Sequence, residues 1–305
     1  MQNSSRAEGN SAKRDVVASV NYIKDDVKDL VYHSESVSAD KTVAKKTNMA
    51  ARVETVMPMC TETVTFEDLR DSVDSVTLDR EGICLVSSPT IMVDFRNHDE
   101  FRRVHLKELH DVVKAVTGAE KVIIGHDTKG QLWGHRISDR AAQFGEKGTS
   151  YPGRFAHVDY SDAGGEAAIR EMLADDPDTE RLLAGRYAIY NLWRAISDPP
   201  QDCPLGLCDA RSVEPEDLIV SRTVRGEGKD RVEREANFVR YNPTHRWVYF
   251  RDMTRDELLI FRGFESDPAR SMRVPHTAFD DPLVGLTAPP RESIDLRCAV
   301  FYGNA

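Results

Sequence analysis

Apolar positions in the first half of the chain follow helical spacing in one long segment. They recur three or four residues apart between residues 104 and 117, and Gly118 follows directly. This spacing predicts an amphipathic helix over 104–117 that ends at the glycine. The next residues, KVIIG, predict a short buried strand. We therefore expect residues 15–150 to form a part of mixed helix and strand.

Short runs rich in aromatic and β-branched residues dominate the second half. These runs are FAHVDYS, RYAIYNLWRAI, DLIVSRTV, RWVYFRDM, ELLIFRGF and SIDLRCAVFY. Runs of this kind predict strands of an antiparallel β core. Between the first two, GGEAAIREMLADD has helical spacing and predicts a helix beside the sheet. The charged or proline-rich connectors predict loops at 198–212 and 226–236, which we expect to govern specificity.

This order of elements predicts a mainly β protein with flanking helices, of the α+β class. Six or more strands with helices outside favour a double-stranded β-helix, the jelly-roll of the cupin type, over a doubly wound sheet. Residues 1–14 are polar and predict a flexible tail. We expect a single domain over 15–305, with residues 151–305 forming the jelly-roll core and carrying the site.

Charge and composition narrow the classes of partner. The 305 residues carry 41 Lys and Arg against 51 Asp and Glu, a formal charge of −10. Such a chain lacks the basic field that attracts nucleic acid or anionic lipid, and no apolar run is long enough for a membrane helix. Five cysteines without a secretory signal predict reduced thiols. We expect a cytoplasmic protein that binds a small molecule; if it assembles, base rates favour a homodimer.

The chemistry-bearing residues begin with a histidine and an aspartate in one predicted strand. The chain has no phosphate-binding glycine loop, H-E-x-x-H or G-x-S-x-G sequence. In HVD, His157 and Asp159 share one face of a strand and could bind one metal ion together. A second histidine from elsewhere would complete a 2-His-1-carboxylate triad. Alternatively, the two residues are a polar pair at a strand end, because H-x-[DE] also occurs by chance in this chain.

The carboxy-terminal stretch supplies matching groups. His276 precedes a predicted loop, and Arg291 opens the last strand fifteen residues later. Alternation places Arg291, Ser293 and Arg297 on the face opposite the apolar core face. Guanidinium groups on an inner barrel wall would bind a carboxylate bidentately, as a dicarboxylic cosubstrate requires. The alternative is a pair of surface arginines beside acidic neighbours.

A third strand has two distinct faces. In RYAIYNLWRAI, Tyr187, Asn191 and Trp193 share one face. We expect this face to line the cosubstrate or substrate pocket, together with Tyr160 after the HVD sequence. Equally, the tryptophan could pack under the inserted helix and the asparagine could satisfy a turn.

Six motifs in order resemble a known family. They are HVDYS with the following Gly-Gly, NLWR, PLGLCDARSV, RWVYFRDMTRDELLIFRGFES, PHTAFDDP and PPRESIDLRCAVFY. Together they resemble the mainly fungal hydroxylase/desaturase family of iron(II)/2-oxoglutarate-dependent oxygenases, which includes the aspergillic acid hydroxylase, gibberellin desaturases and the cephamycin methoxylation component. Upstream the sequence departs from that pattern around His126, so no role is carried over to that residue.

The resemblance implies a ligand set and a reaction. His157, Asp159 and His276 would bind Fe(II), and 2-oxoglutarate and O2 would be cosubstrates. Arg291 with Ser293 would hold the distal carboxylate of 2-oxoglutarate, with Arg297 and Asn191 nearby. The implied reaction oxidises an unactivated C–H bond of a small secondary metabolite or amino-acid-derived acid, by hydroxylation, desaturation or ring closure, and yields succinate.

Two other classes stay open on the sequence. A cupin-like metal enzyme that does not consume 2-oxoglutarate would keep the triad and have no use for Arg291. A non-catalytic jelly-roll binding module would use its histidines only for packing.

Overall fold

Two β-sheets make up most of the described chain. The computed structural model describes residues 14–28, 30–34, 57–125, 134–138, 140, 149–225, 232–270, 273–285 and 287–303. The larger sheet has the order β1-β3-β13-β10-β15-β8-β12-β11-β2. Its strands are β1 (Val16–Ile23), β2 (Leu30–Ser34), β3 (Met59–Asp68), β8 (His157–Val158), β10 (Leu205–Cys208), β11 (Leu218–Arg225), β12 (Val232–Val239), β13 (Trp247–Tyr249) and β15 (His276–Ala278).

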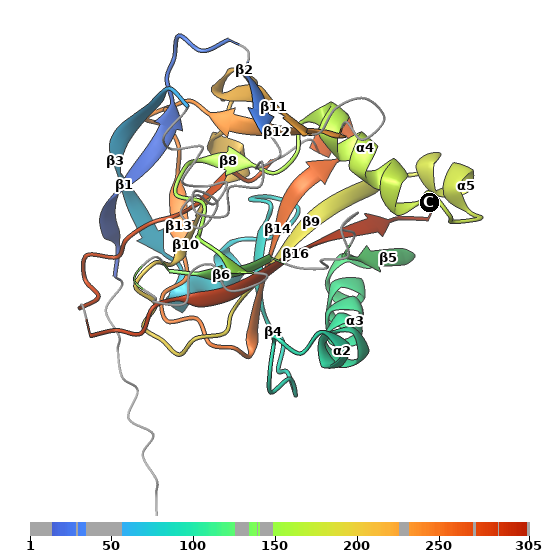
Figure 1. The fold of residues 1–305 in the computed structure, drawn as a ribbon, viewed down its shortest axis with the longest axis horizontal. Coiled ribbons are helices and arrows are strands. Elements are labelled where there is room, and N and C mark those ends of the chain that lie inside the picture. Colours follow the sequence, from blue (N-terminus) through green and yellow to red (C-terminus); the bar gives the residue numbers. More distant parts are fainter. Residues whose placement is uncertain are drawn as a thin grey trace, which may run out of the picture.

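The smaller sheet lies opposite the larger one (Figure 1). Its order is β4-β14-β9-β16-β6-β7, and β5 also pairs with β16. The strands are β4 (Ile83–Ser87), β5 (Lys121–Ile124), β6 (Gly134–Ile137), β7 (Thr149–Ser150), β9 (Tyr187–Ala195), β14 (Glu257–Glu265) and β16 (Glu292–Phe301). Most pairings are antiparallel, and the two facing sheets confirm the predicted jelly-roll.

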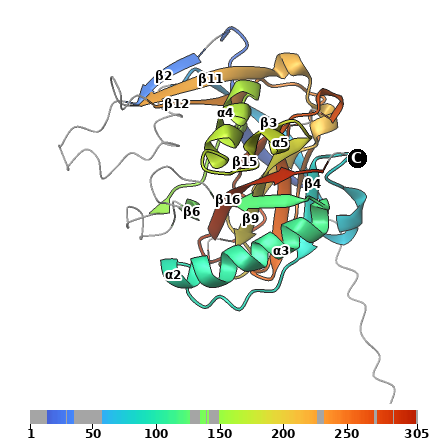
Figure 2. The same ribbon diagram turned by 90° about the vertical axis from the view of Figure 1, so that its right-hand side faces the viewer.

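Helices pack on both faces of the smaller sheet, α3 on its outer face and α4 and α5 on the face that also lines the cavity. They are α2 (His98–Glu100), the π-helical turn η2 (Phe101–His105), α3 (Leu106–Thr117), α4 (Asp162–Met172) and α5 (Thr179–Leu183), with short 3-10 turns η1 (Arg70–Ser75), η3 (Ala210–Ser212), η4 (Pro215–Asp217) and η6 (Pro268–Arg270). Figure 2 shows α2 and α3 as one rod beside β9 and β16. The inserted helix predicted after HVDYS is confirmed as α4.

The helix predicted over 104–117 starts earlier than its apolar spacing indicates. It begins at His98, because the Asn97 side chain accepts a hydrogen bond from the Glu100 N–H at 3.1 Å and caps the first turn. Its end is as predicted, since Gly118 has φ 66°.

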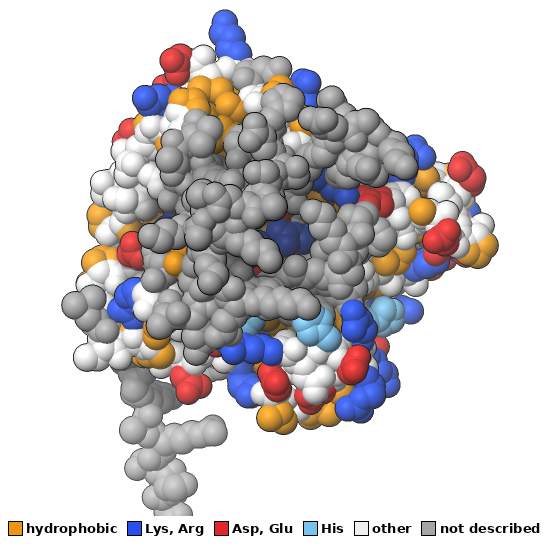
Figure 3. Space-filling view, viewed as in Figure 1, with side chains coloured by type: hydrophobic (Ala, Val, Ile, Leu, Met, Phe, Trp, Pro, Cys, Tyr) orange, Lys and Arg blue, Asp and Glu red, His pale blue; other side chains and the backbone are white. Residues whose placement is uncertain are grey.

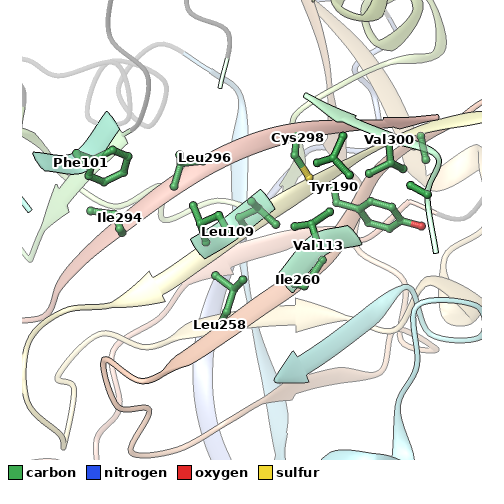
Figure 4. Close-up of a cluster of buried hydrophobic side chains, with 14 of the residues drawn as sticks. Phe101, Leu109, Val113, Tyr190, Leu258, Ile260, Ile294, Leu296, Cys298 and Val300 are labelled. Atoms are coloured by element: carbon green, nitrogen blue, oxygen red, sulfur yellow. The ribbon is translucent and has the colours of Figure 1, made fainter. Parts of the chain in front are cut away.

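The main hydrophobic core lies between this helix and the smaller sheet (Figure 4). Leu109 and Val113 of α3 are fully buried against apolar side chains of β9, β14 and β16. The sheet residues in this cluster include Tyr190, Leu192, Leu258, Ile260, Ile294, Leu296, Cys298 and Val300. The last four were predicted to share a core face of β16. Because that face is committed to the core, the opposite face of β16 looks between the sheets.

The prediction of loops is partly wrong for two segments. Residues 198–212 contain β10, and residues 226–236 contain the start of β12. β12 pairs with β11 over eight residues in an antiparallel register, from Leu218–Val239 to Arg225–Val232. The sequence of β12 resembles that of a loop because one face of this strand carries charged side chains. The pairing with β11 satisfies its backbone and makes it a strand.

The amino-terminal part is integrated into the barrel. β1 pairs with β3, and β3 pairs in parallel with β13 of the larger sheet. Arg14, the last residue of the predicted tail, belongs to the folded part. Its guanidinium donates a hydrogen bond to Asp281, and its backbone carbonyl accepts one from the Tyr249 hydroxyl. Residues 1–13 lie outside the described residues. Within the described ranges, no helix is long and apolar enough to cross a membrane.

His105 occupies an apolar position in this core. Its ring is fully buried and contacts Phe95 and Phe101 edge to face, with centroids at 5.3 and 5.0 Å. Nδ1 lies 3.0 Å from a Glu108 carboxylate oxygen, and Nε2 has no hydrogen-bond partner. Burial lowers the pKa of His105 to about 4 despite the hydrogen bond to Glu108.

This histidine makes stability depend on pH. Between its unfolded pKa near 6.5 and its native pKa near 4, only the unfolded chain takes up the proton, so stability falls as pH falls. The unfolding free energy of the unaltered protein should fall between pH 7.5 and pH 5. We predict that this fall is smaller by about 2 kcal/mol in the His105→Gln variant. Urea denaturation at both pH values measures this. An equal loss of unfolding free energy in the His105 variant and in the unaltered protein would contradict the prediction.

Candidate metal centre

Two histidines meet across a strand pair of the larger sheet. β8 and β15 are antiparallel neighbours, and His157 lies directly opposite His276. Their ring centroids are 4.3 Å apart. Because directly opposed residues of paired strands point to the same face, this register brings together two histidines 119 positions apart. β8 is only two residues long, and Asp159 follows it in a bend.

Asp159 completes a three-residue group. His157 Nε2 lies 3.8 Å from Asp159 Oδ1, and His276 Nε2 lies 3.8 Å from Asp159 Oδ2. The potential ligand atoms all lie within 4.8 Å of one another. Among the described residues, these three form the group of His, Cys, Asp or Glu side chains whose ligand atoms lie close enough together to hold one metal ion. Two imidazoles and one carboxylate on one side of a cavity have the donor set of a facial metal triad.

Both imidazoles are oriented by the backbone. His157 Nδ1 lies 2.8 Å from the carbonyl oxygen of Phe155, and His276 Nδ1 lies 3.3 Å from that of Val274. A carbonyl only accepts, so Nδ1 carries the proton in each ring and donates it. The lone pair of each Nε2 is then available to a metal ion. The donor atoms and their tautomers therefore suit a metal ion.

The charge states also suit a metal. Burial lowers the pKa of His157 and lowers that of His276 to about 3, so both rings are neutral at neutral pH. Burial alone would raise the pKa of Asp159, but Arg297 and the two imidazoles outweigh it and hold that pKa well below its usual range. Neutral imidazoles beside an ionised carboxylate are the protonation states that metal binding requires.

A cavity of about 310 Å³ opens from the three residues into the space between the sheets. Figure 3 shows a hollow with Lys or Arg atoms at its bottom, between the positions of β8 and β16 in Figure 1. The larger sheet contributes Phe155, His157, Leu205, Ser221, Thr223, Ala236, Phe238, His276 and Ala278. The smaller sheet contributes Arg136, Asn191, Trp193, Phe261, Asp295 and Arg297, with Arg291 just before β16.

Arg291 is a fully buried guanidinium in this cavity. Its side chain donates to the Cys203 carbonyl at 2.7 Å, its Nε has no hydrogen-bond partner, and it lies 5.6 Å from the centre of the Trp193 ring. Within the described part of the chain, no carboxylate pairs with it, since Asp202 accepts from its backbone N–H instead. Among the described residues the buried Ser293 hydroxyl has no hydrogen-bond partner, and Ser293 itself does not line the cavity. Burial of an unpaired charge is costly, so these groups fit a carboxylate ligand.

Arg297 and Asn191 lie closer to the triad than to Arg291's end of the cavity. Arg297 donates to Asp159 Oδ2 from Nε at 3.2 Å and from a terminal nitrogen at 2.8 Å. Asn191 donates to the same oxygen at 2.5 Å. We expected both residues near the cosubstrate, and in the structure both side chains donate to Asp159. Trp193 lines the cavity beside Arg291, as its strand face predicts.

Two residues proposed for the substrate pocket lie elsewhere. Tyr187 and Tyr160 belong to the apolar cluster under α4 and α5, with Ile189 and Phe264, and neither lines the cavity. Tyr187 shares the strand face of Asn191, but it lies at the end of β9 that these helices cover. No pattern in the sequence marks where α4 and α5 begin to cover β9.

Other cavity residues escaped the sequence reasoning. Phe238 lies on β12, which was predicted as a loop, so its face could not be assigned. Phe155 opens the predicted strand run FAHVDYS, but no role was assigned to it, and Arg136 belongs to no motif. Among the other histidines, His105, His135 and His245 have buried side chains with acidic partners away from the cavity, and His110 is partly exposed on α3. His126 lies outside the described residues.

Comparisons with known proteins agree with this site. A family model described as "Oxidoreductase/YMDC permease-like domain" matches residues 20–301. The Fe(II)/2-oxoglutarate-dependent dioxygenase nvfI of Aspergillus novofumigatus is 31% identical over 247 residues, covering 79% of this chain and 84% of that protein. The hydroxylase/desaturase efuI of Hormonema carpetanum is 31% identical over 262 residues, covering 81% and 86%. The solved structure of the iron and alpha-ketoglutarate-dependent endoperoxidase NvfI has a TM-score of 0.73 at 26% identity, covering 95% of this chain and 99% of that one.

The fold and the site together define a jelly-roll enzyme with a His-Asp-His metal group. The chain belongs to the family of Fe(II)/2-oxoglutarate-dependent dioxygenases and hydroxylase/desaturases that these relatives represent. Its cofactor is Fe(II), with 2-oxoglutarate and O2 as cosubstrates.

Proposed function

We propose that the chain oxidises an unactivated C–H bond of a small, largely apolar metabolite, by hydroxylation, desaturation or ring closure. His157, Asp159 and His276 hold the iron in this proposal. Arg291, assisted by Ser293, holds the distal carboxylate of 2-oxoglutarate. When bound, the iron would activate O2, which is the oxidant, and 2-oxoglutarate would supply two electrons as it is converted to succinate and CO2.

The observation that carries the proposal is the pairing of two features in one cavity. A metal-type donor group and a buried guanidinium without a carboxylate partner both line it. A dicarboxylate with a metal-chelating end and a distal carboxylate satisfies both features at once. If the protein were a metal enzyme that does not use 2-oxoglutarate, the buried charge of Arg291 would have no counter-charge. If it were a binding module without a metal, the Nε2 atoms of His157 and His276 would have no ligand.

The chain's own residues position the reactants. Arg291 fixes 2-oxoglutarate by a charge-assisted hydrogen bond, and Trp193 packs beside that guanidinium. The apolar walls of the cavity exclude water from the reacting carbon. The protein therefore determines which C–H bond lies near the iron.

The substrate side of the cavity lies over β11 and β12. Phe238 pairs with His157 across β12 and β8, and it stacks on Phe155 with centroids 5.1 Å apart. The next cross-strand pair outward is the small pair Ser221 and Ala236. The two aromatic rings and the small side chains beside them leave room for a planar apolar substrate next to the metal group.

The cations of the described lining favour a neutral substrate. Arg136 pairs with Asp295, Arg234 with Glu171, and Arg297 with both Asp159 and Asp295. Arg291 is therefore the cation left for an anionic ligand, and 2-oxoglutarate takes it. Of the two substrate classes implied by the resemblance, the neutral secondary metabolite fits better than the amino-acid-derived acid.

Arg291 gives the first test. We predict that Arg291→Leu weakens 2-oxoglutarate binding about 10- to 100-fold, because a hydrogen bond between charged groups is lost in a buried site. Anaerobic calorimetric titration of the Mn(II)-loaded protein with 2-oxoglutarate measures the affinity. Arg136→Leu, a cavity arginine already paired with Asp295, is the control and should change it much less. Unchanged affinity in Arg291→Leu rejects the assigned role.

Substrate class gives the second test. Substrate binding commonly accelerates 2-oxoglutarate consumption, so succinate release reports a fit without knowledge of the product. We predict that neutral polycyclic metabolites stimulate succinate release by the Fe(II)-loaded enzyme and that N-acyl amino acids of similar size do not. The reverse ranking contradicts the neutral, apolar assignment.

A further inference from the structure

The two carboxylate oxygens of Asp159 have different surroundings. Oδ2 accepts three hydrogen bonds, one from Asn191 and two from Arg297. Oδ1 accepts none from the described residues; each oxygen lies 3.8 Å from one histidine, Oδ1 from His157 Nε2 and Oδ2 from His276 Nε2. A carboxylate oxygen has about two lone-pair positions, so Oδ2 is saturated and Oδ1 is available.

We propose that Arg297 and Asn191 are positioning residues that hold Asp159 Oδ2 and so present Oδ1 alone to the metal. This inference rests on the proposed function, because it takes His157, Asp159 and His276 as the iron ligands. A carboxylate held in this way binds through one oxygen and leaves neighbouring coordination positions open. Those positions are the ones that a chelating cosubstrate and O2 require.

Arg297 is itself held from its other side. A terminal nitrogen donates to Asp295 Oδ2 at 2.5 Å, and Asp295 Oδ1 accepts from Arg136 Nε at 3.1 Å. Gly134 on β6 makes room for that carboxylate, because a Cβ there would lie 2.2 Å from Asp295 Oδ1. The guanidinium therefore bridges two acidic groups and has little freedom to turn away from Asp159.

Asn191 is fixed by a β-bulge. The register between β14 and β9 shifts between Arg262 and Phe264, which places Gly263 against the asparagine side chain. A Cβ at Gly263 would lie 2.9 Å from Asn191 Oδ1. Within the described ranges that oxygen has no hydrogen-bond partner, so only the amide nitrogen makes a hydrogen bond, and it donates to Asp159. The opposite orientation would place two oxygens together, which is repulsive.

Cobalt(II) binding tests the proposal without turnover. We expect Arg297→Met and Asn191→Ala each to weaken Co(II) affinity 10- to 100-fold, the usual effect of removing a group that orients a metal ligand. We also expect altered visible absorption of bound Co(II), since a released carboxylate changes the coordination. Arg297→Lys keeps the charge but cannot make both hydrogen bonds to Oδ2, so it should restore affinity only in part.

The control is the other arginine of the same strand face. Arg291→Leu should leave Co(II) affinity unchanged, because its guanidinium does not contact the triad. Circular dichroism of the metal-free proteins shows that each variant is folded; if Arg297→Met is not, Arg297→Lys and Asn191→Ala decide. No Co(II) binding by the unaltered protein overturns the metal site itself. Equal or tighter binding and an unchanged spectrum in the folded variants overturn only the role of Arg297 and Asn191.

Discussion

The cross-strand pairing of His157 with His276 is the constraint on which the site depends. Because β8 and β15 are in register at this one position, two rings 119 residues apart in sequence lie 4.3 Å apart. Each ring donates Nδ1–H to the carbonyl two residues before it, so the local strand geometry selects the tautomer as well as the position. A shift of one residue would turn either imidazole to the opposite face of the sheet.

The two sheets have separate tasks. The larger sheet supplies the metal group and the apolar substrate wall, whereas the smaller sheet supplies the arginines that face them. β16 combines these demands in one strand: Ile294 and Leu296 pack against α3, while Asp295 and Arg297 face the cavity. The helix layer therefore stabilises the strand whose other face is charged. The packing of Ile294 and Leu296 against α3 therefore holds the charged side chains of Asp295 and Arg297 in place on the cavity face.

The sequence predicted the features that local periodicity or a motif encodes. The jelly-roll class, α3, α4 and the two faces of β16 followed from apolar spacing, and the His-x-Asp and His residues followed from the resemblance. β12 was missed because its polar outer face hides the alternation, and Tyr187 was assigned to the cavity because spacing cannot show where α4 and α5 cover β9. The contacts of Arg297 and Asn191 with Asp159 depend on distances between strands, which one-dimensional patterns do not contain.

The central claim is that His157, Asp159 and His276 hold iron next to a 2-oxoglutarate site. Anaerobic visible absorption tests it most directly, because 2-oxoglutarate chelated to Fe(II) has a weak charge-transfer band that neither component has alone. The band is expected when 2-oxoglutarate is added to the Fe(II)-loaded protein, and it should be absent in folded His157→Ala. Absence of the band in the unaltered protein with bound iron, or its persistence in His157→Ala, would contradict the account.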